Sequence, residues 1–392
     1  MLIFVACLVI FVYGMLSSLL GTIIPGLADQ LHLTNSVIGY IALAQGIGLA
    51  GTSVFAGALM DRKGTKLGVS VGLIATIAGL GLLTQSTNAF SIAISMAVLG
   101  FGGSIVIVGA NAITNEAGGE KRAAALNFLN VFSGLGGLVT PFVAGNLLGA
   151  NPRRTAVFGL LATILVLVVA LLTPISKKHR PQNSQATSSP FGNASLYLLS
   201  AVTLLYTACE FGIWNWLPKY LIAMGMPSAR ALTILSLGFA SGLLLGRVAA
   251  TPVLMRASPL AVTVSCSVAM ALFTYLILQP MPTWVISIMV FLAGIAMAPV
   301  FPTTVAMIGK IFRSRSATAI GFAITCGFSG LILSSPVIGW LSGSDPKGIG
   351  RGLLLLPCCS IAICMILLSS HKVFNQEEGH QAGVASVVGD EL

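Results

Sequence analysis

The stretch Gly57-Ala-Leu-Met-Asp61-Arg62-Lys63-Gly64-Thr-Lys66 places four charged side chains and two glycines in a short gap of the sequence. Apolar runs near residues 36–60 and 67–85 precede and follow its charged part, which extends from Asp61 to Lys66. A run of about 20 apolar residues is long enough to cross a bilayer as a helix. The gap therefore predicts a short polar loop between two transmembrane helices.

The composition of the whole chain indicates that it lies in a membrane. Of its 392 residues, 56% are hydrophobic and only 8% are charged, whereas soluble domains carry about 25% charged residues. The formal net charge of +10 does not indicate a nucleic-acid partner, because the basic residues lie in short gaps between apolar runs. That placement is typical of residues that set orientation in a membrane.

Twelve apolar runs are long enough to span a bilayer. They lie near 1–25, 36–60, 67–85, 90–113, 124–149, 154–174, 194–222, 230–254, 259–279, 284–308, 317–342 and 352–370. The first run starts at Met1 without a basic leader and is long enough to span, which favours a transmembrane helix over a cleavable signal peptide.

The only long polar stretch inside the chain, from Ser176 to Pro190, divides these runs six and six. We expect an all-α membrane protein with twelve transmembrane helices in two six-helix bundles, and a central cavity with the substrate site near the midplane. The expected units are an N-terminal bundle (1–175), a cytoplasmic linker (176–193), a C-terminal bundle (194–371) and a disordered cytoplasmic tail (372–392).

The basic residues predict the orientation. Six of the twenty Lys and Arg residues fall in gaps on one side of the membrane, and the other fourteen fall on the opposite side. The six are Arg153, Arg154, Lys219, Arg230, Lys347 and Arg351. Because cytoplasmic loops are enriched in Lys and Arg, the richer side is cytoplasmic. We expect both termini in the cytoplasm and the chain in the inner membrane as a monomer.

No metal site, cofactor or enzyme motif is expected. The seven cysteines all lie in apolar runs without metal-ligand spacing, and the four histidines fall in loops and in the tail. The cysteines are interpreted as small apolar side chains. The sequence also contains no nucleotide-binding loop, no nucleophile motif and no added soluble domain, so a membrane enzyme or a non-transporting sensor is disfavoured.

The stretch 57–66 resembles the major facilitator superfamily signature Gly-x-x-x-Asp-Arg-x-Gly-x-Lys/Arg, which lies between helices two and three of that family. The resemblance implies a conformational latch that holds the two halves together on the cytoplasmic side when the carrier faces outward. Its residues would be Gly57, Asp61, Arg62, Gly64 and Lys66. The competing interpretation is a basic loop that only sets topology.

Three further stretches are similar to the fucose:proton symporter group and its sugar-carrying relatives. They are Gly109-Ala-Asn111 continuing through Arg122 to Pro141, Glu210-Phe-Gly-Ile-Trp214-Asn215-Trp216-Leu-Pro218-Lys-Tyr220, and Ala298-Pro299-Val-Phe301-Pro302-Thr303. The resemblance implies import of a neutral, hexose-like sugar by proton symport through alternating access. The partners would be a small sugar, a proton and the lipid bilayer.

A drug or metabolite:proton antiporter of the same superfamily is the alternative. The Gly137-to-Gly145 stretch with Pro141 resembles the helix-five motif of antiporters, but Thr140 stands where that motif has Gly. Helix four also lacks the buried Arg of antiporters. Both departures disfavour this alternative.

Glu210 is the one acid among ten that falls deep inside an apolar run. It lies roughly 24 Å along its helix from the expected start at Ala194. Ionisable residues inside a membrane are costly and mark functional sites, so Glu210 is the candidate for proton coupling and for substrate binding. The competing role is a structural acid that is hydrogen-bonded to another helix.

Trp214 follows Glu210 by one helical turn and shares its face. An aromatic ring beside the Glu210 carboxylate and the Asn215 amide would match the apolar C–H face and the hydroxyls of a sugar. Trp216 is interpreted as an anchor at the membrane interface, where Trp is enriched.

Other polar positions add weaker candidates for substrate binding. Asn127, Asn130, Gly134, Gly137 and Pro141 recur at three- and four-residue spacing on one helix. Asn130 is the better ligand of the two amides, because Asn127 is one turn from the cytoplasmic end.

Gln45 and Asn111 are further candidate ligands, whereas Thr325 is not expected to bind substrate because its own helix can satisfy its hydroxyl. Arg247 is expected to have a gating or structural role, paired with Glu116 or Glu120 or extended to the interface.

Overall fold

The computed structural model describes residues 2–118, 122–173, 190–254, 256–312, 316–345 and 348–369. Within these ranges the chain is helical, and no strand occurs. The helices are α1 (Leu2–Leu31), α2 (Asn35–Lys63), α3 (Thr65–Thr84), α4 (Ala89–Gly118), α5 (Arg122–Asn146), α6 (Pro152–Leu172), η2 (Pro190–Gly192), α7 (Ala194–Ala223), α8 (Ser228–Thr233), η3 (Ile234–Ala240), α9 (Ser241–Leu254), α10 (Pro259–Ile277), α11 (Thr283–Met297), α12 (Val300–Ile311), α13 (Ser316–Ser342), α14 (Ile349–Leu353) and α15 (Leu355–Ser369).

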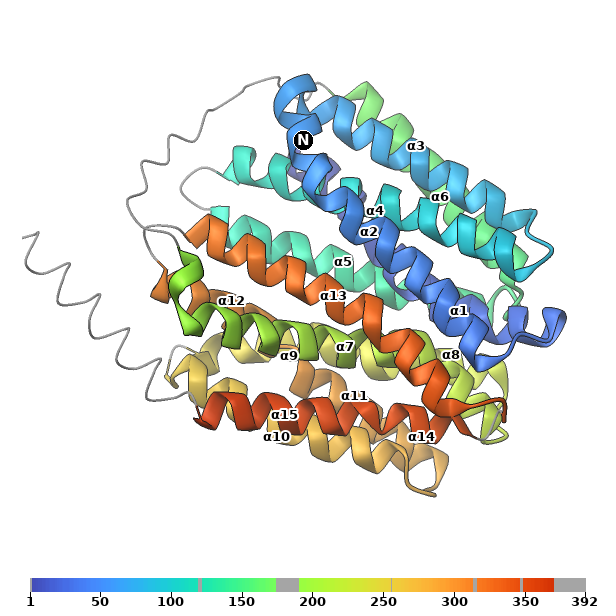
Figure 1. Cartoon of the computed structure of the whole chain (residues 1–392). Helices are drawn as coiled ribbons and strands as arrows, with labels where there is room; N and C mark the ends of the chain where they lie inside the picture. The colour runs from blue at the N-terminus through green and yellow to red at the C-terminus, as the bar shows by residue number, and fades with distance from the viewer. Residues whose placement is uncertain are drawn as a thin grey trace, which may run out of the picture.

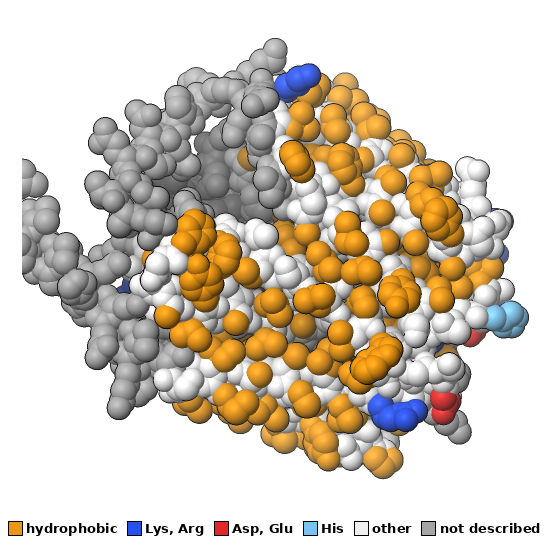
Figure 2. Space-filling view, viewed as in Figure 1, with side chains coloured by type: hydrophobic (Ala, Val, Ile, Leu, Met, Phe, Trp, Pro, Cys, Tyr) orange, Lys and Arg blue, Asp and Glu red, His pale blue; other side chains and the backbone are white. Residues whose placement is uncertain are grey.

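The predicted membrane fold is confirmed. Eleven helical segments of the described chain are long and apolar enough to cross a membrane, and α2, with 29 residues, is a further helix of spanning length. Hydrophobic side chains cover the face shown in Figure 2, while charged side chains lie toward its ends. Phe55, Phe90 and Trp340 are among the large apolar residues that are more than two-thirds exposed. Such a surface requires lipid around it.

Three of the spans are interrupted. The segment from Ser228 to Leu254 contains the π-helix η3 between α8 and α9. The segment from Thr283 to Ile311 breaks between α11 and α12 at Pro299, because proline lacks the N–H that would continue the helix. The last span divides into α14 and α15 at Leu354. Of these three interruptions, η3 is π-helical, and π-helical turns are frequent at functional sites.

The helices from α1 to α6 and those from α7 to α15 form the upper and lower parts of the molecule in Figure 1. We call these two parts the N-half and the C-half. Contacts between them are concentrated in α2 with α13, α1 with α7, and α5 with α8 and η3. The expected linker and tail fall largely outside the described residues, so these boundaries stay predictions.

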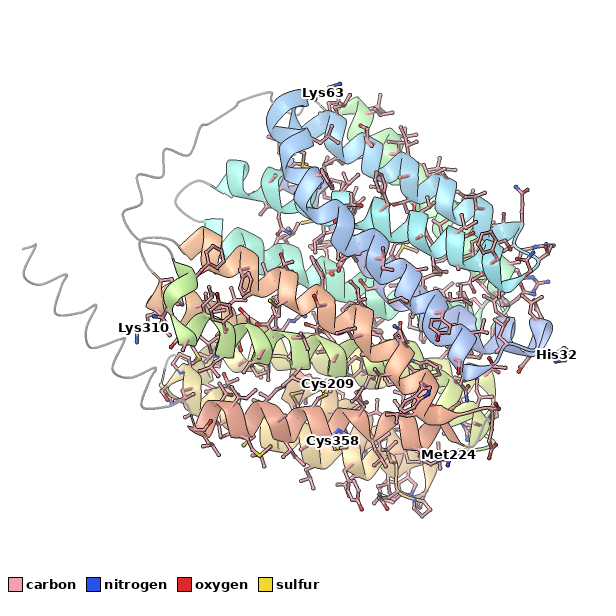
Figure 3. The ribbon with its side chains drawn as sticks, viewed as in Figure 1. His32, Lys63, Cys209, Met224, Lys310 and Cys358 are labelled. Carbon is pink, nitrogen blue, oxygen red and sulfur yellow. The ribbon has the colours of Figure 1, made fainter. Side chains whose placement is uncertain are left out.

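Figure 3 defines the two ends of the molecule. His32 and Met224 lie at one end, called the His32 end, and Lys63 and Lys310 lie at the opposite end, called the Lys63 end. Cys209 lies between the two ends.

The face of α5 that is turned to the C-half shows that the halves pack at the His32 end and separate toward the Lys63 end. A Cβ atom on Gly145 would lie 3.0 Å from the Ala229 carbonyl oxygen, and one on Gly137 would lie 3.2 Å from the Trp214 ring. On the same face, nearer the Lys63 end, Asn130 is exposed.

Helix α13 shows the same divergence from α2. A Cβ atom on Gly39 of α2 would lie 2.8 Å from the Ser335 carbonyl oxygen, and one on Gly339 would lie 2.5 Å from the Asn35 carbonyl oxygen. Gly321, nearer the start of α13, is exposed and has no atom within 4 Å of its Cβ position. The space between the halves therefore opens toward the Lys63 end.

Candidate substrate and proton site

Glu210 lies in the middle of α7, 16 residues after Ala194 and 13 before Ala223. Its carboxylate is within electrostatic reach of two tyrosine hydroxyls, that of Tyr13 on α1 and that of Tyr206 on α7. Tyr13 belongs to the N-half and Tyr206 to the C-half. The one acid expected deep in a span therefore lies where the two halves meet, and it is half-buried there.

Tyr206 precedes Glu210 by one helical turn and was not predicted from the sequence. Its side chain is 1% exposed, and its ring centroid lies 6.0 Å from that of Phe301 on α12. The signal that would have found it is the spacing of Tyr206, Glu210 and Trp214, because residues four apart share one helix face. From the sequence, this helix face was followed from Glu210 toward Trp214 but not toward Tyr206.

Trp214 lies one turn closer to the His32 end than Glu210, and it is 6% exposed. Its ring meets Phe239 of η3 edge to face, with centroids 5.1 Å apart and planes at 77°. The six-membered ring of the indole lies against Gly137 of α5. Trp214 therefore fills the contact between the halves at the closed side of the site, and its role as a sugar-stacking surface stays a prediction.

The two residues after Trp214 are buried. The Asn215 amide donates a hydrogen bond to the Ser335 hydroxyl of α13 over 3.1 Å, so substrate would have to compete with this bond. The expectation that Trp216 is an interface anchor is wrong, because Trp216 has no exposed surface and its ring packs against Gly339. The turn of α7 around these residues faces α13 rather than lipid headgroups.

The remaining candidate ligands are distributed over three helices. Asn130 of α5 is exposed on the face turned to the C-half. Gln45 of α2 is half-buried, and its backbone packs closely against Gly100 of α4. Asn111 of α4 donates its amide proton to the Ile107 carbonyl of its own helix over 2.8 Å. Asn130 is therefore the most accessible of the three, and all three roles stay predictions.

Arg247 lies two turns inside the end of α9 and is half-buried. Its guanidinium is within electrostatic reach of the Tyr206 hydroxyl. Glu116 and Glu120, its expected partners, have side chains outside the described part of the chain. The site thus combines one acid, one arginine and two tyrosines in the middle of the fold.

Two residues of the predicted latch can be placed. Gly64 separates α2 from α3 with a φ of 91°, which glycine adopts without strain. Lys66 donates hydrogen bonds to the Leu171 and Thr173 carbonyls, over 2.8 and 2.9 Å. A lysine stabilises the negative end of a helix in this way, so here Lys66 holds α6 within the N-half. The side chains of Gly57, Asp61 and Arg62 lie outside the described residues.

A polar clasp closes the His32 end across the halves. It consists of Asn35 on α2, Lys219 on α7, and the Gly343 and Asp345 carbonyls after α13. The Asn35 amide donates to these two carbonyls over 3.0 and 3.3 Å, and its oxygen accepts a hydrogen bond from Lys219 over 2.7 Å. Sequence reasoning assigned no role to Asn35, which lies between two other polar residues, Thr34 and Ser36, at a helix start.

The arrangement as a whole places one ionisable acid among tyrosine, tryptophan and asparagine side chains of the two halves. Among the described residues, no group of three or more His, Cys, Asp or Glu side chains could hold a metal ion. An acid between two halves that separate at one end is the architecture of a secondary transporter.

The comparison with known families agrees with this class of protein. A family model described as Major Facilitator Superfamily matches residues 6–335. The chain therefore belongs to the Major Facilitator Superfamily, as the signature around Asp61 implied, and it is a multi-pass transporter rather than an enzyme.

Similar proteins share the fold over nearly the whole chain. Protein TsgA of Escherichia coli O6:K15:H31 (strain 536 / UPEC) is 23% identical over 379 residues, covering 94% of this chain and 95% of that protein. A mutant of the nucleoside transporter NupG superposes with a TM-score of 0.80 at 16% identity, covering 94% of this chain and 99% of that chain. A D-xylose-proton symporter superposes with a TM-score of 0.76 at 14% identity, covering 93% and 96%.

Proposed function

We propose that the protein imports a neutral, hexose-like sugar together with a proton by alternating access. The observation that carries this proposal is the position of Glu210, in the middle of α7 and within electrostatic reach of a tyrosine of the N-half and a tyrosine of the C-half. A side chain at this position becomes exposed when the halves separate and enclosed when they close.

Protonation of Glu210 supplies the coupling. An ionised carboxylate is costly to enclose in a low-dielectric interior, whereas the neutral acid is not. The halves therefore close over the site more readily when Glu210 is protonated. Because the proton binds on one side of the membrane and is released on the other, the proton gradient drives the cycle of closing and opening.

The chemistry around Glu210 favours a polar, uncharged solute. Asn130 offers amide groups for hydroxyls, and Trp214 offers an apolar ring for a C–H face. Gln45, Asn111 and Asn215 complete the set of proposed ligands. The similarity to a D-xylose-proton symporter supports a sugar, while the nucleoside transporter makes a nucleoside the first compound to test against it.

The proposal includes the orientation of the protein in the membrane. Lys63, Lys66 and Lys310 lie at or near the Lys63 end, and the Lys/Arg distribution favours a cytoplasmic location for this end. The protein itself is proposed to be an inner-membrane monomer. The halves then face inward in this structure, closed outside by the Asn35 clasp. In the outward-facing state, Gly57, Asp61, Arg62, Gly64 and Lys66 would latch the cytoplasmic side.

The direct test is uptake into proteoliposomes that contain the purified full chain. Radiolabelled D-glucose, L-fucose, D-xylose and uridine are each offered with and without an inward proton gradient. Accumulation of one of the sugars, abolished by a protonophore, is the expected result. Accumulation of uridine alone would contradict a sugar substrate. Loss of preloaded solute driven by an inward proton gradient would instead indicate the antiporter.

A further inference from the structure

The hydroxyl of Tyr206 is an unusual group in this structure. It is fully enclosed, it makes no hydrogen bond of ordinary geometry among the described residues, and the Glu210 carboxylate is an acceptor within its reach. An unpaired buried hydroxyl costs stability, and buried polar atoms in folded proteins are nearly always paired. Phenylalanine would fill the same space without the cost of enclosing a hydroxyl, so the tyrosine at this position needs a reason.

The neighbourhood of Tyr206 supplies that reason. Its hydroxyl lies one helical turn from Glu210 on the same face of α7, within electrostatic reach of that carboxylate. The ring packs near Phe301, so the side chain is held in place. A hydroxyl donates well to an ionised carboxylate, and hydrogen bonds to charged groups are about twice as strong as neutral ones.

We propose that Tyr206 is a positioning residue whose hydroxyl donates a hydrogen bond to Glu210 when this acid is ionised, and so sets the pH at which Glu210 takes up a proton. The proposal rests on the coupling role proposed above for Glu210. In it, the unpaired hydroxyl belongs to the protonated state, and the hydrogen bond forms when the proton leaves.

Other groups around the pair act on the same equilibrium. Tyr13 of α1 faces Glu210 from the N-half. Arg247 of α9 is within electrostatic reach of Tyr206. Cys209 of α7 also lies near Tyr206, and its thiol donates to the Leu356 carbonyl of α15 and lies near Cys359. These groups stay in place in a Tyr206→Phe variant, so that substitution isolates the contribution of one hydroxyl.

The test is a pH titration of the full chain in lipid vesicles, without substrate, followed by infrared difference spectroscopy of the carboxylic C=O band. The band of Glu210 is identified by its absence from Glu210→Gln. Losing a donor to the ionised form favours the protonated form, so Tyr206→Phe is expected to raise the midpoint of this band by about one pH unit, the size of one such hydrogen bond.

Tyr220→Phe is the matched control, because Tyr220 is a buried tyrosine of the same helix nearly three turns beyond Glu210. It is expected to leave the midpoint unchanged. A midpoint that is also unchanged in Tyr206→Phe, or that moves to lower pH, would overturn the role of Tyr206 while leaving that of Glu210 intact. If Glu210→Gln loses no carboxylic C=O band, the result would overturn both the role of Tyr206 and that of Glu210.

Discussion

At the scale of single residues, the site is built on one face of α7. Tyr206, Glu210 and Trp214 follow one another at four-residue spacing. The acid lies in mid-helix, with a buried hydroxyl on one side and a buried indole toward the closed end. This order places Glu210, the proposed proton-binding group, next to the contact between the halves, so that in the proposed cycle protonation and closure involve neighbouring side chains.

Truncation of Trp214 tests its proposed contact with sugar. A stacked aromatic ring contributes about 1 kcal/mol beyond its buried area, so Trp214→Ala is expected to weaken sugar binding several-fold to tenfold. The measurement is equilibrium binding of the transported sugar by the purified protein. Unaltered affinity would show that Trp214 only seals the site. Phe239→Ala, which removes the ring that Trp214 contacts, serves as the packing control.

The sequence predicted part of this site and not the rest. Glu210 could be found because a carboxylate inside an apolar run is conspicuous. Tyr206 was missed because the four-residue spacing was followed only from Glu210 toward Trp214, and nothing in the sequence shows that the Tyr206 hydroxyl is enclosed. Trp216 was misplaced for a related reason: a tryptophan near a helix end is typical of the interface, and only the packing of α7 on α13 shows that it is buried.

At the scale of helices, the closed end depends on close approach of backbones. The twelve spans follow directly from apolar run length, which is why the fold was predictable. Their pairing across the halves was not, because it rests on small residues such as Gly39 and Gly339 that meet a carbonyl of the opposite helix. Close helix contacts of this kind are typical of membrane proteins.

A side chain at Gly39 is therefore expected to open the His32 end. Gly39→Val places atoms against the Ser335 carbonyl, so the halves must separate there. The measurement is the distance between spin labels on cysteines at positions 32 and 344, in a background without other cysteines. The distance is expected to increase. Gly321→Val is the control, because the same substitution there meets open space on α13 and should leave the distance between the labels unchanged. An equal increase in both variants would contradict this account.

At the scale of the whole molecule, the two halves are joined at the His32 end by the Asn35 clasp and separate toward the Lys63 end. Asn35→Ala removes three hydrogen bonds across the halves, each contributing about 1 kcal/mol. The same pair of spin labels should therefore report a larger population of separated distances. Asn88→Ala, which removes an asparagine that bonds only within the N-half, is the control. An unshifted distribution in Asn35→Ala would show that the clasp does not hold this state.

The proposed orientation is tested by labelling from the two sides of the membrane. Single cysteines at Gln182 and Ser344 should react with an impermeant maleimide from opposite sides, position 182 from the cytoplasm and position 344 from outside. The expectation follows from the excess of Lys and Arg on the Lys63 side. Reaction of both positions from one side would refute the twelve-span topology.

The measurement that tests the central claim most directly compares exchange with accumulation in Glu210→Gln. Glutamine keeps the shape of the side chain and loses its titration. The account predicts that counterflow exchange of the transported sugar survives in proteoliposomes, while uphill uptake driven by a proton gradient disappears. Accumulation against the sugar gradient in Glu210→Gln would contradict the claim, because the proton would then be carried elsewhere. Loss of binding itself would make Glu210 a direct sugar ligand and contradict its role as the coupling acid alone.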